Sequence, residues 1–194
     1  MKRILIIPTL LLINFAVSGQ RIPNPTVIIE AIIRAKQDTA HIFYYDSVAT
    51  SYRIDDIKTN LANRTIKSLC KDTTANNSIT LTKAEQKYIF NQLDSLCNLV
   101  WTTNLFTNSK RVSHDSLGTI VFKEIEKANR LGWEAKSGKQ IWEFTNPIFL
   151  RQNSIFLLFT LYICGGECGR DELCFYKNIN GNWKKWIVVS SGVF

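Results

Sequence analysis

The segment that most constrains the fold is an apolar run near the C-terminus, Phe156 to Ile163, with the sequence FLLFTLYI. Neither face of such a run suits contact with water, so we predict a strand in the middle of a sheet, covered on both sides. Two further strands are predicted at Glu172 to Asn178 and at Trp183 to Ser190. Between them, Asn180-Gly181 is a strong hairpin signal because both residues accept the positive φ of a type I′ turn. Residues 154–194 are therefore predicted to form a three-strand antiparallel meander.

A first helix is predicted near the N-terminus. Asn24 and Pro25 are typical of an N-cap and a first helical residue. The residues from Val27 to Ile33 supply a broad apolar stripe, which indicates a helix that packs against a core. On the exposed side of this helix, Glu30 and Arg34 are four residues apart and are expected to pair.

The clearest helical pattern lies between Thr82 and Val100. Thr82 and Glu85 form a capping box, and apolar residues recur on one face, at Ile89, Leu93, Leu96, Cys97 and Val100. A weaker pattern predicts another helix between Asp55 and Lys71. The residues expected to point inward from it are Ile57, Leu61, Leu69 and Cys70.

Several shorter extended segments complete the chain. We predict strands at His41 to Val48, around Arg111, at Gln140 to Phe144 and at Ile148 to Leu150, with a break at Asn146-Pro147. Helices thus come mostly first and strands mostly last. This order favours an α+β fold, in which N-terminal and central helices pack on a C-terminal antiparallel β-meander.

The N-terminus has the layout of a secretory signal peptide. Lys2 and Arg3 precede the apolar run ILIIPTLLLINFAV, and the small residues Ser18 and Gly19 follow it. The run is shorter than the roughly 20 apolar residues that a spanning helix needs, so cleavage is favoured over retention as an anchor. We predict a signal peptide over residues 1–19, and no transmembrane segment once it is cleaved.

The remaining residues, 20–194, are predicted to form one globular domain, because no linker or repeat interrupts them. Lys and Arg number 24 against 16 Asp and Glu, but only Lys110-Arg111 and Lys184-Lys185 form short basic runs. Contacts to a phosphate backbone need basic residues gathered into a stripe, so we expect no nucleic-acid partner. An exported protein, periplasmic or extracellular, that contacts an envelope surface or another protein fits this charge.

Four features of the second half carry a resemblance to known sequences. They are the segment WEFTNPIF, the apolar strand with Tyr162, the loop CGGECG from Cys164 to Gly169, and the segment NGNW from Asn180 to Trp183. Together they resemble a group of uncharacterised exported bacterial proteins with a Cys-Gly-x-x-Cys-Gly loop and an Asn-Gly-x-Trp hairpin. The resemblance covers Trp133 to Val189, with departures at Thr145-Asn146 and at Arg170-Asp171. It implies the fold and export, and it assigns no functional residue.

The chain has five cysteines, an odd number for a protein of an oxidising compartment. We predict a disulfide between Cys164 and Cys168, and as second choice a bridge between Cys70 and Cys97. Cys174 is then left over, as a buried strand residue. The alternative unites Cys164, Cys168 and Cys174 in a metal site or redox centre, although their spacing matches neither a zinc finger nor a thioredoxin-type pair.

Other candidate groups are few. His41 begins a strand, and His114 lies in the polar segment Ser113 to Ser116, where surface roles are expected. Asp55-Asp56 and Asp171-Glu172 have the chemistry to hold a cation or to act as acid and base, but we expect them to cap elements or end loops. We therefore predict no catalytic, cofactor-binding or metal-binding residue.

The aromatic residues are expected mainly to pack in the core. Trp183 and Trp186 are three apart, so on one strand they are expected to face opposite sides, and the alternative role for Trp186 is an exposed contact point beside Lys184-Lys185. We expect a non-enzymatic exported protein that binds a partner or ligand through the sheet or the cysteine loop. The alternative is a secreted enzyme, either a thiol redox protein using Cys164 and Cys168 or a hydrolase using His114 with carboxylates.

Overall fold

The structure is a computed structural model of the chain. It describes residues 24–36, 41–48, 50–70, 77–97, 99–101, 104–113, 116, 118–120, 122–123, 126, 140–164 and 168–193. The predicted signal peptide, residues 1–19, lies outside the described residues. None of the helices in the described ranges has both the length and the apolar character needed to cross a membrane.

Seven strands of the described chain form one mixed sheet. They are β1 (Ile42–Tyr45), β4 (Ser109–Val112), β5 (Ile141–Phe144), β6 (Ile148–Leu150), β7 (Ile155–Ile163), β8 (Gly169–Ile179) and β9 (Asn182–Val193). The order is β4-β1-β5-β7-β8-β9, and β6 pairs with β7. β7 has neighbours along both edges, β5 and β6 on one and β8 on the other, which confirms the central position predicted for the apolar run.

The three C-terminal strands form the predicted antiparallel meander, with longer strands than the sequence indicated. Asn180 and Gly181 join β8 to β9 with φ angles of 53° and 83°. Both angles are positive, as the hairpin signal required. The predicted break at Asn146-Pro147 is also confirmed, because β5 ends at Phe144 and β6 begins at Ile148.

The strands of the other half of the sheet were predicted, but their pairing was not. β1 runs parallel to both β4 and β5, so the sheet is mixed rather than an antiparallel meander alone. The strand pattern of the segment around Phe43 was visible in the sequence, but its partners lie far along the chain, at Lys110 and Ile141. Local patterns do not specify such distant parallel pairing, which needs a crossover connection.

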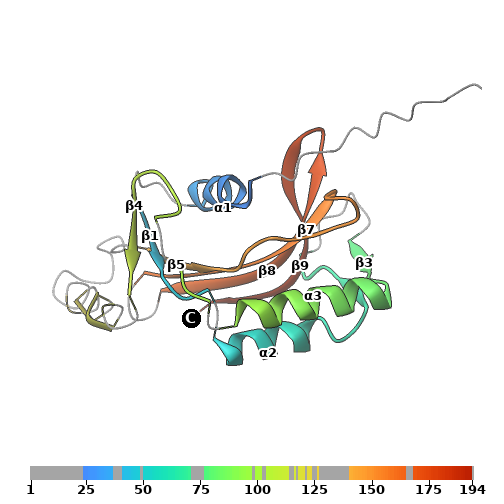
Figure 1. Cartoon of the computed structure of the whole chain (residues 1–194), viewed down its shortest axis with the longest axis horizontal. Helices are drawn as coiled ribbons and strands as arrows, with labels where there is room; N and C mark the ends of the chain where they lie inside the picture. Colours follow the sequence, from blue (N-terminus) through green and yellow to red (C-terminus); the bar gives the residue numbers. More distant parts are fainter. Residues whose placement is uncertain are drawn as a thin grey trace, which may run out of the picture.

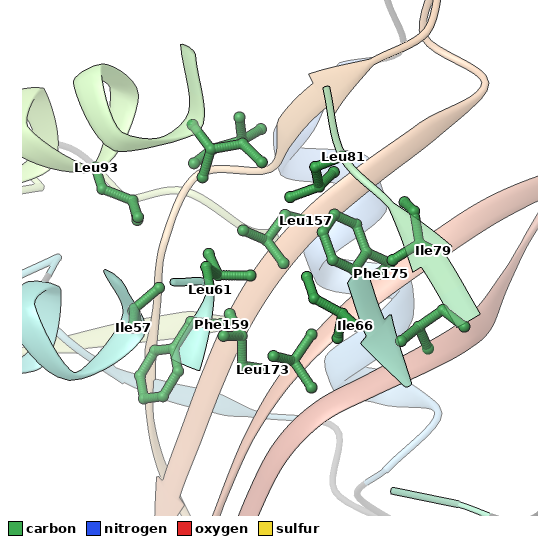
Figure 2. Close-up of a cluster of buried hydrophobic side chains, with 14 of the residues drawn as sticks. Ile57, Leu61, Ile66, Ile79, Leu81, Leu93, Leu157, Phe159, Leu173 and Phe175 are labelled. Atoms are coloured by element: carbon green, nitrogen blue, oxygen red, sulfur yellow. The ribbon is translucent and has the colours of Figure 1, made fainter. Parts of the chain in front are cut away.

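Helices cover both faces of the sheet (Figure 1). α1 (Pro25–Arg34) lies on one face, where Ile28, Ile29 and Ile33 pack in a cluster with residues of β1, β5, β7, β8 and β9. α2 (Ser51–Asn60) and α3 (Lys83–Leu96) lie on the opposite face, together with the hairpin of β2 (Thr65–Lys67) and β3 (Ser78–Thr80). Figure 2 shows the second cluster, in which Leu61 and Leu93 meet Leu157, Phe159 and Phe175 of the sheet.

The local signals of two helices are confirmed. Asn24 caps α1 through a 3.1 Å hydrogen bond from the backbone N–H of Thr26, and Arg34 pairs with Glu30 at 2.8 Å. Thr82 and Glu85 form both hydrogen bonds of the capping box at the start of α3. α3 ends at Leu96, earlier than predicted, and Val100 is half exposed instead of packing inward.

The helix predicted over residues 55–71 is confirmed only as far as Asn60, and of the residues expected to point inward Ile57 and Leu61 are buried. α2 begins four residues earlier, at Ser51, and ends at Asn60. The chain then turns into β2, where β-branched residues pair with Ser78–Thr80. Leu69 and Cys70, which were expected to point inward, are exposed, and the backbone N–H of Leu69 donates to the carbonyl of Val188 in β9.

Candidate ligand-binding site

An apolar hollow lies between α1 and the end of the β8–β9 hairpin. Its volume is about 510 Å³. The α1 side is formed by Ile28, Ala31, Ile32 and Ala35, and the hairpin side by Tyr176 and Trp183. Figure 1 shows this end of the hairpin rising on the same side of the sheet as α1. Ligand pockets of soluble proteins are typically 300–1,000 Å³ and mostly apolar, so this hollow has the size and character of a binding site.

Aromatic packing holds the hairpin wall of the cavity in place. Phe156 of β7 stacks on Tyr176 with ring centroids 4.9 Å apart, and its edge meets Trp183 at 4.7 Å. Phe149 of β6 also contacts Trp183, at 6.1 Å. Such ring pairs stabilise by about 0.5–1.5 kcal/mol each beyond the area that they bury. The wall is therefore set by the sheet itself.

Polar side chains meet at one end of the cavity, around the carboxylate of Glu172. Lys36 donates to Glu172 Oε2 at 2.6 Å, and Lys185 donates to both carboxylate oxygens, at 3.0 and 2.8 Å. Arg170 Nη2 lies 2.9 Å from Oε1. Among the described residues, Glu172 is the one carboxylate paired with these three cations, and it is almost fully buried. Three positive charges against one negative charge leave the cluster at a formal +2.

The arrangement keeps Glu172 ionised. Burial opposes ionisation, but hydrogen bonds from Lys185 and Lys36, together with their charges, outweigh it and hold the pKa of Glu172 below its ordinary value. Lys36 is well placed for a cation, because it follows the C-terminus of α1, where the helix carbonyls carry partial negative charge. Its Nζ also lies 5.9 Å from the ring centroid of Trp142.

A β-bulge in β9 directs Lys185 into this cluster. Phe175 of β8 pairs with Ile187, and the next residue, Tyr176, pairs with Lys185, so Trp186 is an extra residue in β9. Ile187 and Trp186 pack on the α2–α3 face, whereas Lys185 reaches Glu172 on the α1 face. Bulges commonly redirect a side chain in this way.

A second cavity, of about 270 Å³, adjoins the first. It is lined by Tyr162, Arg170 and Glu172, with Lys36 and Lys185. These two lysines line both cavities. An apolar hollow and a polar, positively charged hollow thus share one boundary, which the side chains of Lys36 and Lys185 form.

The predicted Cys164–Cys168 disulfide is present at the turn between β7 and β8, with the two Cα atoms 5.1 Å apart. Its backbone closes as well, because the N–H of Cys164 donates to the carbonyl of Cys168 at 2.7 Å. The disulfide lies next to the polar cavity, since Arg170 follows it by two residues and pairs with Tyr162 in register. It therefore braces the strand ends that carry part of the site.

The remaining cysteines are free thiols. The bridge predicted as second choice, between Cys70 and Cys97, is not formed. Cys70 lies beyond β2 near β9, whereas Cys97 is the C-cap of α3 and packs against the core cluster on the α2–α3 face. Cys174 is buried in β8, as predicted, and burial raises the pKa of its thiol to about 12. In the part of the chain that the structure describes, His, Cys, Asp and Glu side chains form no cluster of three suited to a metal ion.

We had expected the two carboxylate pairs to cap elements or end loops, and the structure places them elsewhere. Asp55 and Asp56 are exposed within α2. Asp171 and Glu172 lie in β8, where neighbouring side chains point to opposite faces, so Asp171 accepts from the N–H of Gly192 at 2.7 Å and pairs with Arg53 at 3.5 Å. Adjacent carboxylates on opposite faces do not share one cation or one substrate.

Two further expectations concern histidine and tryptophan. His114 lies outside the described residues, and His41 is exposed at the start of β1. Trp183 and Trp186 do pack on opposite faces, as predicted. Trp186 is half-buried against the core, which was the favoured prediction, with Lys177 Nζ 5.2 Å from its ring centroid.

Sequence reasoning missed the cluster around Glu172. One signal was present: Arg170, Glu172, Cys174 and Tyr176 alternate along the strand predicted from Glu172 onward and the two residues before it, so charged residues share a face with buried ones. No protein-family model, curated protein or solved structure significantly matches this chain. The function must therefore be argued from the geometry of the site.

Proposed function

We propose that this protein binds an apolar small molecule in the cavity between α1 and the β8–β9 hairpin. The observation that carries the proposal is the cavity of about 510 Å³ with Ile28 and Ile32 on one wall and Trp183 on the other. Each buried methylene of a ligand contributes about 0.8 kcal/mol, so a site of this kind binds through the area that it removes from water.

The protein is proposed to act outside the cytoplasm and without catalysis. The Cys164–Cys168 disulfide supports this location, because such bonds form and persist in oxidising compartments. The proposal also includes cleavage of a signal peptide over residues 1–19. After export, the protein takes up its ligand from the surrounding periplasmic or extracellular fluid or from an envelope surface.

Binding is preferred over thiol redox chemistry for a structural reason. Cys164 is only 5% exposed, whereas Cys168 is exposed. Neither cysteine lines one of the two cavities, and the N–H of Cys164 donates to the carbonyl of Cys168 beside the paired ends of β7 and β8. This position supports a bracing role for the disulfide.

The test is a fluorescence titration with the neutral apolar probe N-phenyl-1-naphthylamine. Ala31→Phe places a ring in the cavity and is expected to weaken probe binding at least tenfold. Val27→Phe is the matched control, because Val27 is on the same helix, is 62% exposed and does not line the cavity. Equal affinities of the two variants, or no probe binding by the unmodified protein, would contradict the proposal.

A further inference from the structure

The cation cluster beside the apolar cavity carries a more specific inference, which rests on the proposed function. We infer that the ligand is an amphipathic carboxylate, whose alkyl chain fills the cavity under α1 and whose head group binds Lys36 and Lys185. These two lysines form the boundary between the apolar and the polar cavity. A molecule with one apolar and one anionic end fits this arrangement, with its apolar end in the first cavity and its anionic end at the polar cavity.

Charge gives the sign of the head group. The cluster of Lys36, Arg170, Lys185 and Glu172 holds a formal +2 within hydrogen-bonding distance of one buried carboxylate. A cationic or neutral head group does not neutralise this excess, whereas a carboxylate removes part of it. Hydrogen bonds between charged groups are also roughly twice as strong as those between neutral groups.

Accessibility allows the lysines to bind a second anion. The side chains of Lys36 and Lys185 are 23% and 38% exposed, so each keeps a surface that Glu172 does not cover. An ammonium group has three donors. Lys36 donates to Glu172 Oε2 and, at 3.4 Å, to Thr160 Oγ1, and Lys185 donates to both oxygens of Glu172, so each lysine keeps a further donor. Glu172 thus fixes the two ammonium groups, and their remaining donors serve the ligand.

The cavity sets the character of the other end. Ile28, Ile32, Tyr176 and Trp183 offer apolar surface to a chain of methylene groups. Each added methylene is expected to tighten binding about fourfold until the cavity is full. A compact anion such as acetate gains none of this and is expected to bind weakly.

The experiment compares decanoate, 1-decanol and decyltrimethylammonium as competitors of N-phenyl-1-naphthylamine on the purified protein. Decanoate is expected to bind at least about tenfold more tightly than decanol at low salt, and decyltrimethylammonium more weakly than either. Octanoate and dodecanoate test the dependence on chain length.

Two variants assign the preference to the cluster. Lys185→Met is expected to remove most of the preference for decanoate over decanol, measured as the ratio of the two affinities within the same variant. Lys184→Met removes the same charge from the neighbouring residue, which is exposed and lines neither cavity, and is expected to keep the preference. If Lys185→Met does not fold, the unmodified protein provides the test. Added salt is expected to lower the affinity for decanoate at least threefold and to leave the affinity for decanol almost unchanged.

The outcomes separate this inference from the proposed function. Equal binding of decanoate and decanol, with displacement of the probe by both, overturns the carboxylate head group and leaves an apolar ligand. Tighter binding of decyltrimethylammonium also overturns it. No displacement by any of the three compounds overturns the proposed function together with the inference.

Discussion

Lys185 and Ile187 lie on opposite faces of the sheet although they are two residues apart in the same strand. A regular strand places such residues on one face, but the extra residue Trp186 resets the alternation. Lys185 consequently reaches Glu172 under α1, while Ile187 packs among the core residues on the α2–α3 side. The charged end of the candidate site thus depends on one bulge.

Glu172→Gln is expected to lower the free energy of unfolding by about 1–3 kcal/mol at neutral pH, because hydrogen bonds to charged partners contribute on this scale. Equilibrium denaturation in urea measures the change. Asp56→Asn is the control: Asp56 is exposed on α2, so its variant should stay within about 0.5 kcal/mol of the unmodified protein.

The effect of Glu172→Gln is also expected to depend on pH. The pKa of Glu172 is lowered in the folded protein, so its stabilisation is present above the ordinary carboxyl pKa of 4.5 and is lost as the pH falls through the folded value. The difference between the two proteins should therefore shrink in acid. A difference that stays constant down to the lowest pH at which both fold would contradict this account of the ion cluster.

Glu143 is expected to give the opposite pH dependence. Burial raises its pKa to about 7, and the charge of Arg53 on α2 only partly opposes this effect. Between pH 4.5 and about 7 the folded protein holds a proton that the unfolded chain has lost, so stability falls as the pH rises through this window. The loss should be on the order of 3 kcal/mol in total.

Glu143→Gln isolates this contribution, because glutamine does not titrate. Urea denaturation of both proteins across this pH range gives two curves, and the difference between them is assigned to Glu143. The curve of the variant should be the flatter one. Parallel curves would show that Glu143 is not protonated in the folded protein at mildly acidic pH.

Replacing Cys164 and Cys168 together by serine is expected to cost no more than about 2 kcal/mol, because so short a loop constrains the unfolded chain little. Cys174→Ser serves for comparison, since it places a hydroxyl among buried apolar residues and should cost about 1–3 kcal/mol. Thermal unfolding of the unmodified protein, the double serine variant and Cys174→Ser measures both losses of stability. Failure of the double serine variant to fold would show that the whole fold depends on the disulfide.

Export is tested on the protein produced in a bacterial host with its own N-terminus. We expect the protein in the periplasmic or extracellular fraction, with Gln20 as its first residue. N-terminal sequencing and a free-thiol count on the same sample check cleavage and the disulfide together. Cytoplasmic protein that retains Met1 to Gly19 would contradict the predicted signal peptide.

The sequence predicted those parts of the fold that short-range chemistry specifies. The turn at Asn180-Gly181 and the capping box of Thr82 and Glu85 each depend on residues within one turn, and both are confirmed. The helix predicted over residues 55–71 is confirmed only as far as Asn60, because the apolar residues of this segment are divided between α2 and β2. In that region tertiary pairing outweighed a weak helical pattern.

The candidate site could not be predicted from short-range sequence patterns, because its residues are far apart in the sequence. Lys36 and Glu172 are 136 residues apart, and only the packing of α1 on the sheet brings them together. The position of Lys185 depends on a bulge, and nothing in the residues around Trp186 indicates an extra residue in the ladder. By contrast, the disulfide was predictable because its cysteines are only four residues apart.

The most direct test of the account is a crystal structure with bound 10-bromodecanoate. The anomalous signal of bromine is expected in the cavity between Ile32 of α1 and Trp183 of β9, with the carboxylate within hydrogen-bonding distance of Lys36 and Lys185. Bromine at any other place on the protein, or an empty cavity at saturating ligand, would contradict the claim that this cavity is a binding site for amphipathic carboxylates.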